Sequence, residues 1–141
     1  MTLDEILGVL ERDSARHMTN GPCQEDELAR LEAALGHALP AELRAFLGRL
    51  GGGVFYDAHE MFGPQRVMIH DIELMPDMLS MRRLLPGLPP DALPFHRSTS
   101  VVHVIEVPRG AGQCRITPLG GGSGYPDLAS FLESVVLPSA P

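Results

Sequence analysis

The sequence predicts an α+β fold, a single domain in which an antiparallel β-sheet packs with N-terminal helices and a C-terminal helix. Apolar residues recur at helical spacing through residues 2–50 and again from residue 128, and short strand-like stretches lie between them. Strands that follow one another without alternating helices favour antiparallel pairing. A chain of 141 residues can bury one sizeable core without disulfides or metal.

The first element is predicted to be a helix from Thr2 to about Met18. Thr2 and Glu5 match the capping-box pattern that marks a helix start. Four apolar residues then share one helical face: Leu3, Ile6, Leu7 and Leu10. We expect the helix to dock by this face on the main body of the domain.

Two further helices are predicted between Glu25 and Gly53. The first carries leucines at i, i+3 and i+7 and is followed by Gly36, which suits the left-handed residue after a helix. The second begins at Pro40, because the missing N–H of proline has no partner to lose at a first helical position. Its apolar stripe consists of Leu43, Phe46, Leu47 and Leu50. Gly51 to Gly53 are expected to end it.

Several short stretches rich in β-branched or aromatic residues are predicted to be strands: Val54–Tyr56, Arg66–His70, Leu93–His96, Val101–Val107 and Gln113–Thr117. The fourth has apolar residues on both faces, which suits a central position in a sheet. We expect it to pair with the fifth through a hairpin loop at Arg109–Gly112. Between residues 71 and 85 the pattern is mixed and indicates a helix that starts or breaks at Pro76.

The chain is predicted to close with a helix whose apolar stripe is Leu128, Phe131, Leu132 and Val135. No internal repeat is present. We therefore expect one domain over residues 1–141, with an N-terminal helix at 1–20, a core at 22–136 and a frayed tail at 137–141.

The helical pair carries a recognisable run of residues: Glu27-Leu28, Leu31-Glu32, Leu35-Gly36, Leu39-Pro40, Leu43, Phe46-Leu47 and Gly51-Gly52. In this run the chain resembles the opening motif of the SUKH superfamily, in its SMI/KNR-type branch. Leu93–Phe95 and a closing helix at Asp127–Leu132 follow in the order of that family, so the likeness extends from about Pro22 over most of the chain. The family often has a Gly- and Asp-rich turn where this chain has His96–Ser100.

The resemblance implies a non-enzymatic protein-binding module. In this family such a module is an immunity protein of a bacterial polymorphic toxin system, which blocks a toxin domain, frequently a nuclease. A second role implied by the superfamily is that of a regulatory interaction domain, like the fungal cell-wall-synthesis regulator. The chain lacks the long disordered flanks of such regulators, which favours the immunity role.

Composition excludes several classes of function. The net charge of −7 argues against a nucleic-acid binder and favours a basic protein partner. All 11 basic residues are arginine, so no lysine nucleophile, Schiff base or P-loop is possible. The N-terminus is acidic, unlike a signal peptide, and no apolar run approaches the ~20 residues of a membrane span. We expect a cytoplasmic protein without a membrane contact or a cofactor.

The histidines are the main candidates for catalysis or metal binding. His59, Glu60 and His70 lack the spacing of a zinc-binding HExxH motif, and exposed loop residues are the commoner outcome. His96 and His103 fall on neighbouring predicted strands and could face each other. A small metal-dependent hydrolase that uses these four histidines is the alternative from the enzyme class. We predict no catalytic residues and no metal site.

The remaining candidates have ordinary structural explanations. Cys23 lies near a helix start, where the helix dipole can lower the pKa of a thiol, but a helix-entry role is commoner. Cys114 suits a buried small hydrophobe. The loop Gly120–Gly124 has neither GxGxxG spacing nor a P-loop lysine, so we expect a connector.

A group of polar residues in the middle segment is the predicted partner-binding site: Asp57, His59, Glu60, Asp71, Glu73 and Asp77. Arg66 is the main compensating cation nearby. Acidic residues gathered in this way can raise the association rate with a basic protein, which here would be the toxin domain.

Overall fold

The computed structural model describes residues 1–107 and 114–141, which form a single α+β domain. Its helices are α1 (Leu3–Arg12), α2 (Glu25–Leu35), α3 (Ala41–Arg49), α4 (Met78–Leu84) and α5 (Leu128–Phe131). Its strands are β1 (His17–Thr19), β2 (Gly53–Phe55), β3 (His59–Met61), β4 (Val67–Ile69), β5 (Ile72–Met75), β6 (Ala92–Arg97), β7 (Val102–Glu106) and β8 (Arg115–Pro118).

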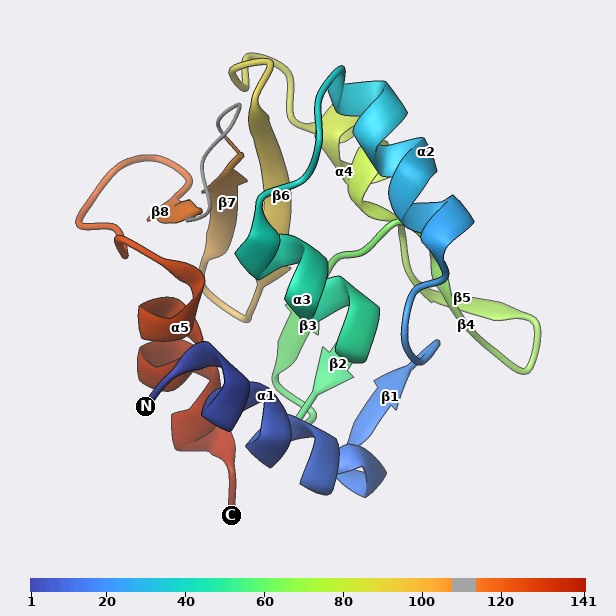
Figure 1. The fold of residues 1–141 in the computed structure, drawn as a ribbon, viewed down its shortest axis with the longest axis vertical. Helices are drawn as coiled ribbons and strands as arrows, with labels where there is room; N and C mark the ends of the chain where they lie inside the picture. Colours follow the sequence, from blue (N-terminus) through green and yellow to red (C-terminus); the bar gives the residue numbers. More distant parts are fainter. Residues whose placement is uncertain (108–113) are drawn as a thin grey trace.

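Six of these strands form an antiparallel sheet in the order β1-β2-β3-β6-β7-β8, and β4 pairs with β5 as a separate hairpin. Helices α1, α3 and α5 lie over one side of the sheet, and the hairpin projects from the body (Figure 1). The predicted fold class is confirmed, as is an interior position for β7. The predicted loop Arg109–Gly112 and Gln113 lie outside the described residues.

The N-terminal helix is shorter than predicted. Its capping box is present, because Glu5 N donates to Thr2 Oγ1 (3.2 Å) and Thr2 N donates to Glu5 Oε1 (3.0 Å). However, α1 ends at Arg12, and His17–Thr19 pair with β2 as the edge strand of the sheet. The backbone groups of these three residues find partners on β2, and this tertiary pairing overrides the local helical tendency.

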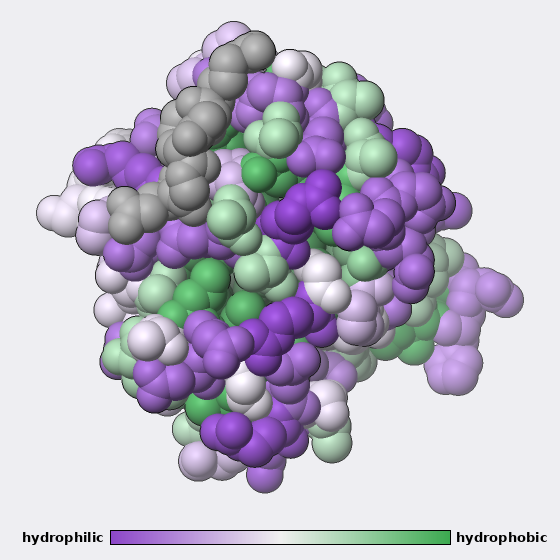
Figure 2. Space-filling view, in the orientation of Figure 1, coloured by the Kyte–Doolittle hydropathy of each residue, from purple (hydrophilic) through white to green (hydrophobic). Residues whose placement is uncertain are grey.

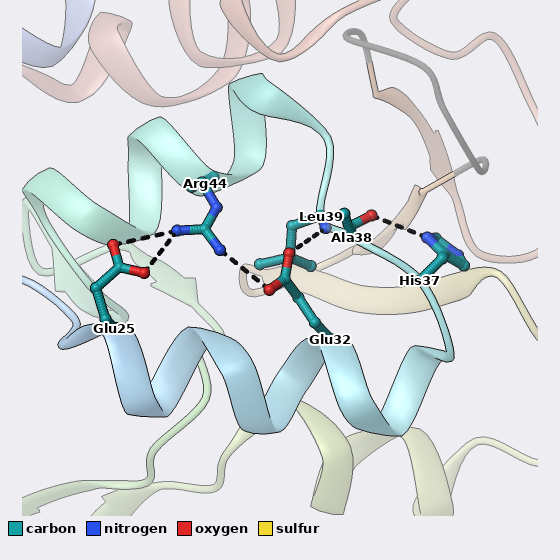
Figure 3. Close-up of polar contacts among 6 residues, drawn as sticks. All are labelled: Glu25, Glu32, His37, Ala38, Leu39 and Arg44. Carbon is teal, nitrogen blue, oxygen red and sulfur yellow. Dashed lines mark hydrogen bonds and ion pairs between the residues drawn. The ribbon is translucent and has the colours of Figure 1, made fainter.

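The helix pair α2–α3 agrees closely with the prediction. Gly36 is left-handed (φ 84°) and ends α2, and Pro40 is the N-cap of α3, one place before the predicted position. Polar contacts fix the junction: Glu32 accepts a hydrogen bond from Leu39 N (2.7 Å), and Arg44 binds both Glu32 and Glu25 (3.0 Å each) (Figure 3). The predicted apolar stripe of α3 is buried.

The segment after β4 contains a strand that the prediction missed. β5 pairs with β4 through a tight turn in which His70 and Asp71 both have positive φ (49° and 65°). Aspartate tolerates this conformation better than most residues. The predicted helix follows as α4, and its N-cap Asp77 accepts a hydrogen bond from Ser80 N (3.0 Å).

A β-bulge in β6 shapes the core beneath α5. The register between β6 and β7 shifts between Pro94 and His96. Both Phe95 and His96 then pack on Phe131, with ring centroids 6.0 and 5.2 Å away. A regular strand would send two successive side chains to opposite faces, so the bulge is what places His96 beneath the helix.

The C-terminal helix continues beyond α5 as a π-helical turn (Leu132–Val136) and a 3₁₀ turn (Leu137–Ser139). The wider π turn buries Val136 in place of the predicted Val135. In the predicted tail at 137–141, the Ser139 hydroxyl lies 2.8 Å from Nε2 of His59.

Candidate functional site

The six predicted partner-binding residues lie in different environments. Asp71 and Glu73 are exposed on the β4–β5 hairpin, and Asp57 is exposed at the turn between β2 and β3. Glu60 is half-buried and paired with Arg97, while the Asp77 carboxylate is engaged in capping α4. His59 is buried and belongs to β3, so its prediction as an exposed loop residue is wrong.

The hairpin of residues 67–75, here called the arm, concentrates exposed apolar surface. The described residues include seven exposed large apolar side chains, of which three belong to the arm: Ile72 (70% exposed), Met68 (39%) and Leu74 (38%). Figure 2 shows the arm projecting from the body, with hydrophobic surface beside its hydrophilic tip. Apolar groups gathered in this way are typical of a protein-binding surface.

One side of the arm borders a hollow of about 460 Å³, here called the outer hollow. Its lining consists of Val54, Asp57, Ala58, Glu60, Leu74, Arg97, Ser98 and Thr99. Glu60 and Arg97 form a bidentate pair in it, with Nε–Oε1 and Nη2–Oε2 distances of 2.9 and 2.8 Å. This pairing raises the pKa of the Arg97 guanidinium. Asp57 makes no ion pair within residues 1–107 and 114–141.

A second hollow, of about 380 Å³, is lined by Asn20, Pro64, Gln65, Arg66, Met68 and Asp77. Each hollow thus includes one apolar side chain of the arm, Leu74 in the outer hollow and Met68 here. Sequence reasoning found the acidic residues of this region but not the apolar ones. Alternating apolar residues at 72 and 74 were the available signal, and they were missed because β5 was not predicted.

Three buried histidines form a continuous hydrogen-bonded chain under α5. Nδ1 of His59 lies 2.9 Å from Nε2 of His96, and Nδ1 of His96 lies 3.0 Å from Nδ1 of His103. His96 and His103 are cross-strand partners in β6 and β7, as the sequence suggested. At the other end, His59 Nε2 contacts Ser139 Oγ. We call this set of four residues the histidine chain.

The geometry does not assemble the metal-dependent hydrolase considered above. His96 faces its two neighbours with opposite ring nitrogens, so the three imidazoles cannot close around one ion. His70 lies apart from them in the turn of the arm. Within the described residues no group of histidine, cysteine or acidic side chains is placed to hold a metal ion.

Burial lowers the pKa of all three imidazoles, and it lowers that of His96 to about 3 with help from the neighbouring histidines. A folded pKa below the unfolded value means that acid favours unfolding. The stability that neutral His96 provides is complete above the ordinary pKa of about 6.5 and is lost as the pH falls from there toward 3.

His96 contributes a loss of about 2 kcal/mol of unfolding free energy between about pH 7.5 and about pH 5, and His59 and His103 add to it, so we expect a total loss of at least about 2 kcal/mol. Urea denaturation at the two pH values measures this difference. The variant His70→Asn, which changes an exposed histidine, should show the same loss. An unfolding free energy that does not change over this interval would contradict a neutral buried His96.

The two cysteines and the glycine loop have structural roles. Burial raises the pKa of the Cys23 thiol to about 12, with a contribution from Glu27, so the thiol stays protonated and the reactive-cysteine alternative loses its basis. Cys114 is buried, with a pKa also raised to about 12. The glycine loop leads from β8 toward α5 and includes three left-handed glycines, Gly120 to Gly122.

No helix in the described part of the chain has the length and apolar character to cross a membrane.

Comparison with known proteins places the chain in a family. A search of curated proteins found no match. The family model described as "SMI1 / KNR4 family (SUKH-1)" matches residues 22–106, which run from the entry to α2 to the end of β7. With the predicted motif and the predicted fold both present, the chain belongs to the SMI1/KNR4 (SUKH-1) family.

Proposed function

We propose that this protein is an immunity protein that binds a bacterial toxin domain and blocks it, without catalysing a reaction. The members of its family are mostly toxin immunity proteins. The acidic balance of the chain supports a basic partner, such as a nuclease domain whose substrate cleft must attract phosphate. We propose the cytoplasm as the place where the toxin is met.

The arm is the observation that carries this proposal. It projects from the domain and presents Met68, Ile72 and Leu74 beside the carboxylates of Asp71 and Glu73. Apolar anchors surrounded by polar groups are the usual composition of a protein interface. The two hollows at its base offer concave surface into which side chains of the partner fit.

Binding would block the toxin by covering its substrate cleft. Asp57, Asp71 and Glu73 form no ion pairs within the described residues, so their charges are available to a basic partner. Attraction between opposite charges raises the association rate, and desolvated apolar contacts slow dissociation. We therefore expect added salt to lower the association rate constant by a larger factor than it raises the dissociation rate constant.

The proposed function is tested by co-expressing this protein with the toxin domain encoded beside it and counting surviving cells. We expect survival when both proteins are made and death when the toxin domain is made alone. Death in the presence of soluble immunity protein at an equal level would contradict the proposal. A purified complex then allows the interface to be tested residue by residue.

Reversing the charge of the arm should slow association with that toxin domain. For the double variant Asp71→Arg/Glu73→Arg we expect an association rate at least about 10-fold lower at low salt, with the difference shrinking as ionic strength rises. Surface plasmon resonance at several salt concentrations measures the association rate and its dependence on ionic strength. Asp26→Arg in the exposed first turn of α2 is the control for Asp71→Arg alone, which changes the net charge by the same amount, and it should have the smaller effect. Equal effects at both places would show that net charge, and not the arm, guides the partner.

A further inference from the structure

The histidine chain has a proton capacity that follows from its connectivity. Its three imidazoles have six ring nitrogens, of which four lie within the two histidine–histidine contacts and two lie outside them. Each contact needs one proton between its two nitrogens, because one nitrogen must donate and the other must accept. When all three imidazoles are neutral, they carry three N–H protons in total. Two of these protons lie in the two histidine–histidine contacts, and the third is on one of the two outer nitrogens.

One additional proton fits without breaking a contact. It fills the second outer nitrogen, so that Nε2 of His59 and Nε2 of His103 both carry hydrogen, and each inner contact keeps its single proton. A second additional proton has only an inner nitrogen left. It then forces two N–H groups to face each other across about 3 Å, and this contact must open.

Packing determines which contact opens. His96 and His103 are paired across neighbouring strands, and both pack on Phe131, with ring centroids 5.2 and 4.9 Å away. His59 lies at the opposite end of the histidine chain from His103, beside the exposed Ser139. The contact between His59 and His96 therefore separates at lower cost, and His59 reaches water where the C-terminal turn now covers it.

The charged and titratable groups around the chain do not offset this charge. Beyond the three histidines themselves, no ionisable group in the described residues shifts the pKa of His96, and burial alone lowers the pKa of His59 and His103. On the helix side, Glu133 pairs with the N-terminal amine and Asp127 caps α5. On the remaining sides, the Tyr125 ring packs on His103, the Glu60–Arg97 pair follows His59 and His96 in β3 and β6, and Ser139 borders a hollow with Arg16, Tyr56 and Asp57.

We propose that the histidine chain is an acid-operated clasp, which holds the C-terminal turn Leu137–Ser139 against β3 and releases it when the second additional proton binds. The link between Ser139 and His59 joins this turn to the sheet across 80 residues of sequence. Release removes the Ser139 and Pro141 wall of a hollow of about 300 Å³, which shares Asp57 with the outer hollow. The clasp does not depend on the proposed function.

Nuclear magnetic resonance on the full chain tests the clasp. Imidazole ¹⁵N shifts report the protonation of each histidine, and ¹H–¹⁵N heteronuclear NOEs of Leu137, Ser139 and Ala140 report order in the turn. From about pH 7.5 to about pH 3 we expect His59, His96 and His103 to titrate in linked steps. The NOEs of the turn should fall with the later step while those of β6, β7 and α5 stay high.

Two variants decide between the clasp and a general acid effect. Ser139→Ala, at an exposed position, should leave the sheet intact and make the turn mobile at every pH. His70→Asn should leave the transition unchanged. The proposal is overturned if the turn stays ordered at the acid end, if it loses order only together with the sheet, or if Ser139→Ala leaves its order and pH dependence as in the natural chain.

Discussion

Replacing Ile72 by aspartate should weaken binding of the proposed toxin partner by about 100-fold, which corresponds to roughly 3 kcal/mol. Ile72 is the most exposed large apolar residue of the described chain, at 70%, and it lies at the start of β5 on the projecting arm. An exposed apolar side chain adds little to folding but becomes an anchor when a partner removes it from water. A buried aspartate without a cation partner would in addition be costly to desolvate.

Leu84→Asp is the matched control, because Leu84 is 69% exposed but lies at the end of α4, away from the arm. We expect Ile72→Asp and Leu84→Asp to unfold at similar urea concentrations, with only the first losing affinity. Isothermal titration calorimetry with the purified toxin domain gives both dissociation constants. An unchanged dissociation constant for Ile72→Asp would exclude the arm as the centre of the interface.

Replacing Gly51 by alanine should destabilise the fold by about 3 to 5 kcal/mol. Gly51 ends α3 in the left-handed region (φ 74°), where a side chain is strained. A Cβ at this position would also overlap the carbonyl oxygen of Gly21, a backbone atom that cannot rotate away. The chain between α1 and α2 therefore passes too close to Gly51 for any side chain to fit.

Gly36→Ala separates the two causes. Gly36 ends α2 with a similar φ of 84°, but a Cβ there meets no atom within 4 Å. We expect a loss of about 1 to 2 kcal/mol from backbone strain alone. Chemical denaturation of both variants measures the difference. Equal losses would show that the backbone near Gly21 moves aside, and that strain is the whole cost at Gly51.

Local signals in the sequence located most helices because their evidence lies within a few residues. The stripe of α3, the left-handed Gly36 and the capping box of α1 each depend on neighbours three to seven positions away. The same signals failed where distant chain segments decide the structure. His17–Thr19 continue a helical stretch in sequence, yet they form a strand because β2 lies alongside.

The candidate surface shows the same division. Acidic residues at 57, 60, 71 and 73 could be read directly, since charge is a property of composition. That Glu60 is paired with Arg97, that Asp77 caps a helix and that Ile72 projects from a hairpin follow from spatial arrangement. The sequence therefore indicated a binding region without its apolar component.

By itself, the sequence determined the α+β class, the family and an acidic chain without lysine, because helical periodicity, motif spacing and composition are local or additive properties. Only the tertiary structure decided that His59, His96, His103 and Ser139 meet in one line. Three different strands and the last turn supply these residues, and a bulge in β6 aims the central one. The His59–His96 and His59–Ser139 contacts join residues 37 and 80 positions apart in the sequence. They depend on how the strands pair and where the last helix packs, which no short stretch of sequence encodes.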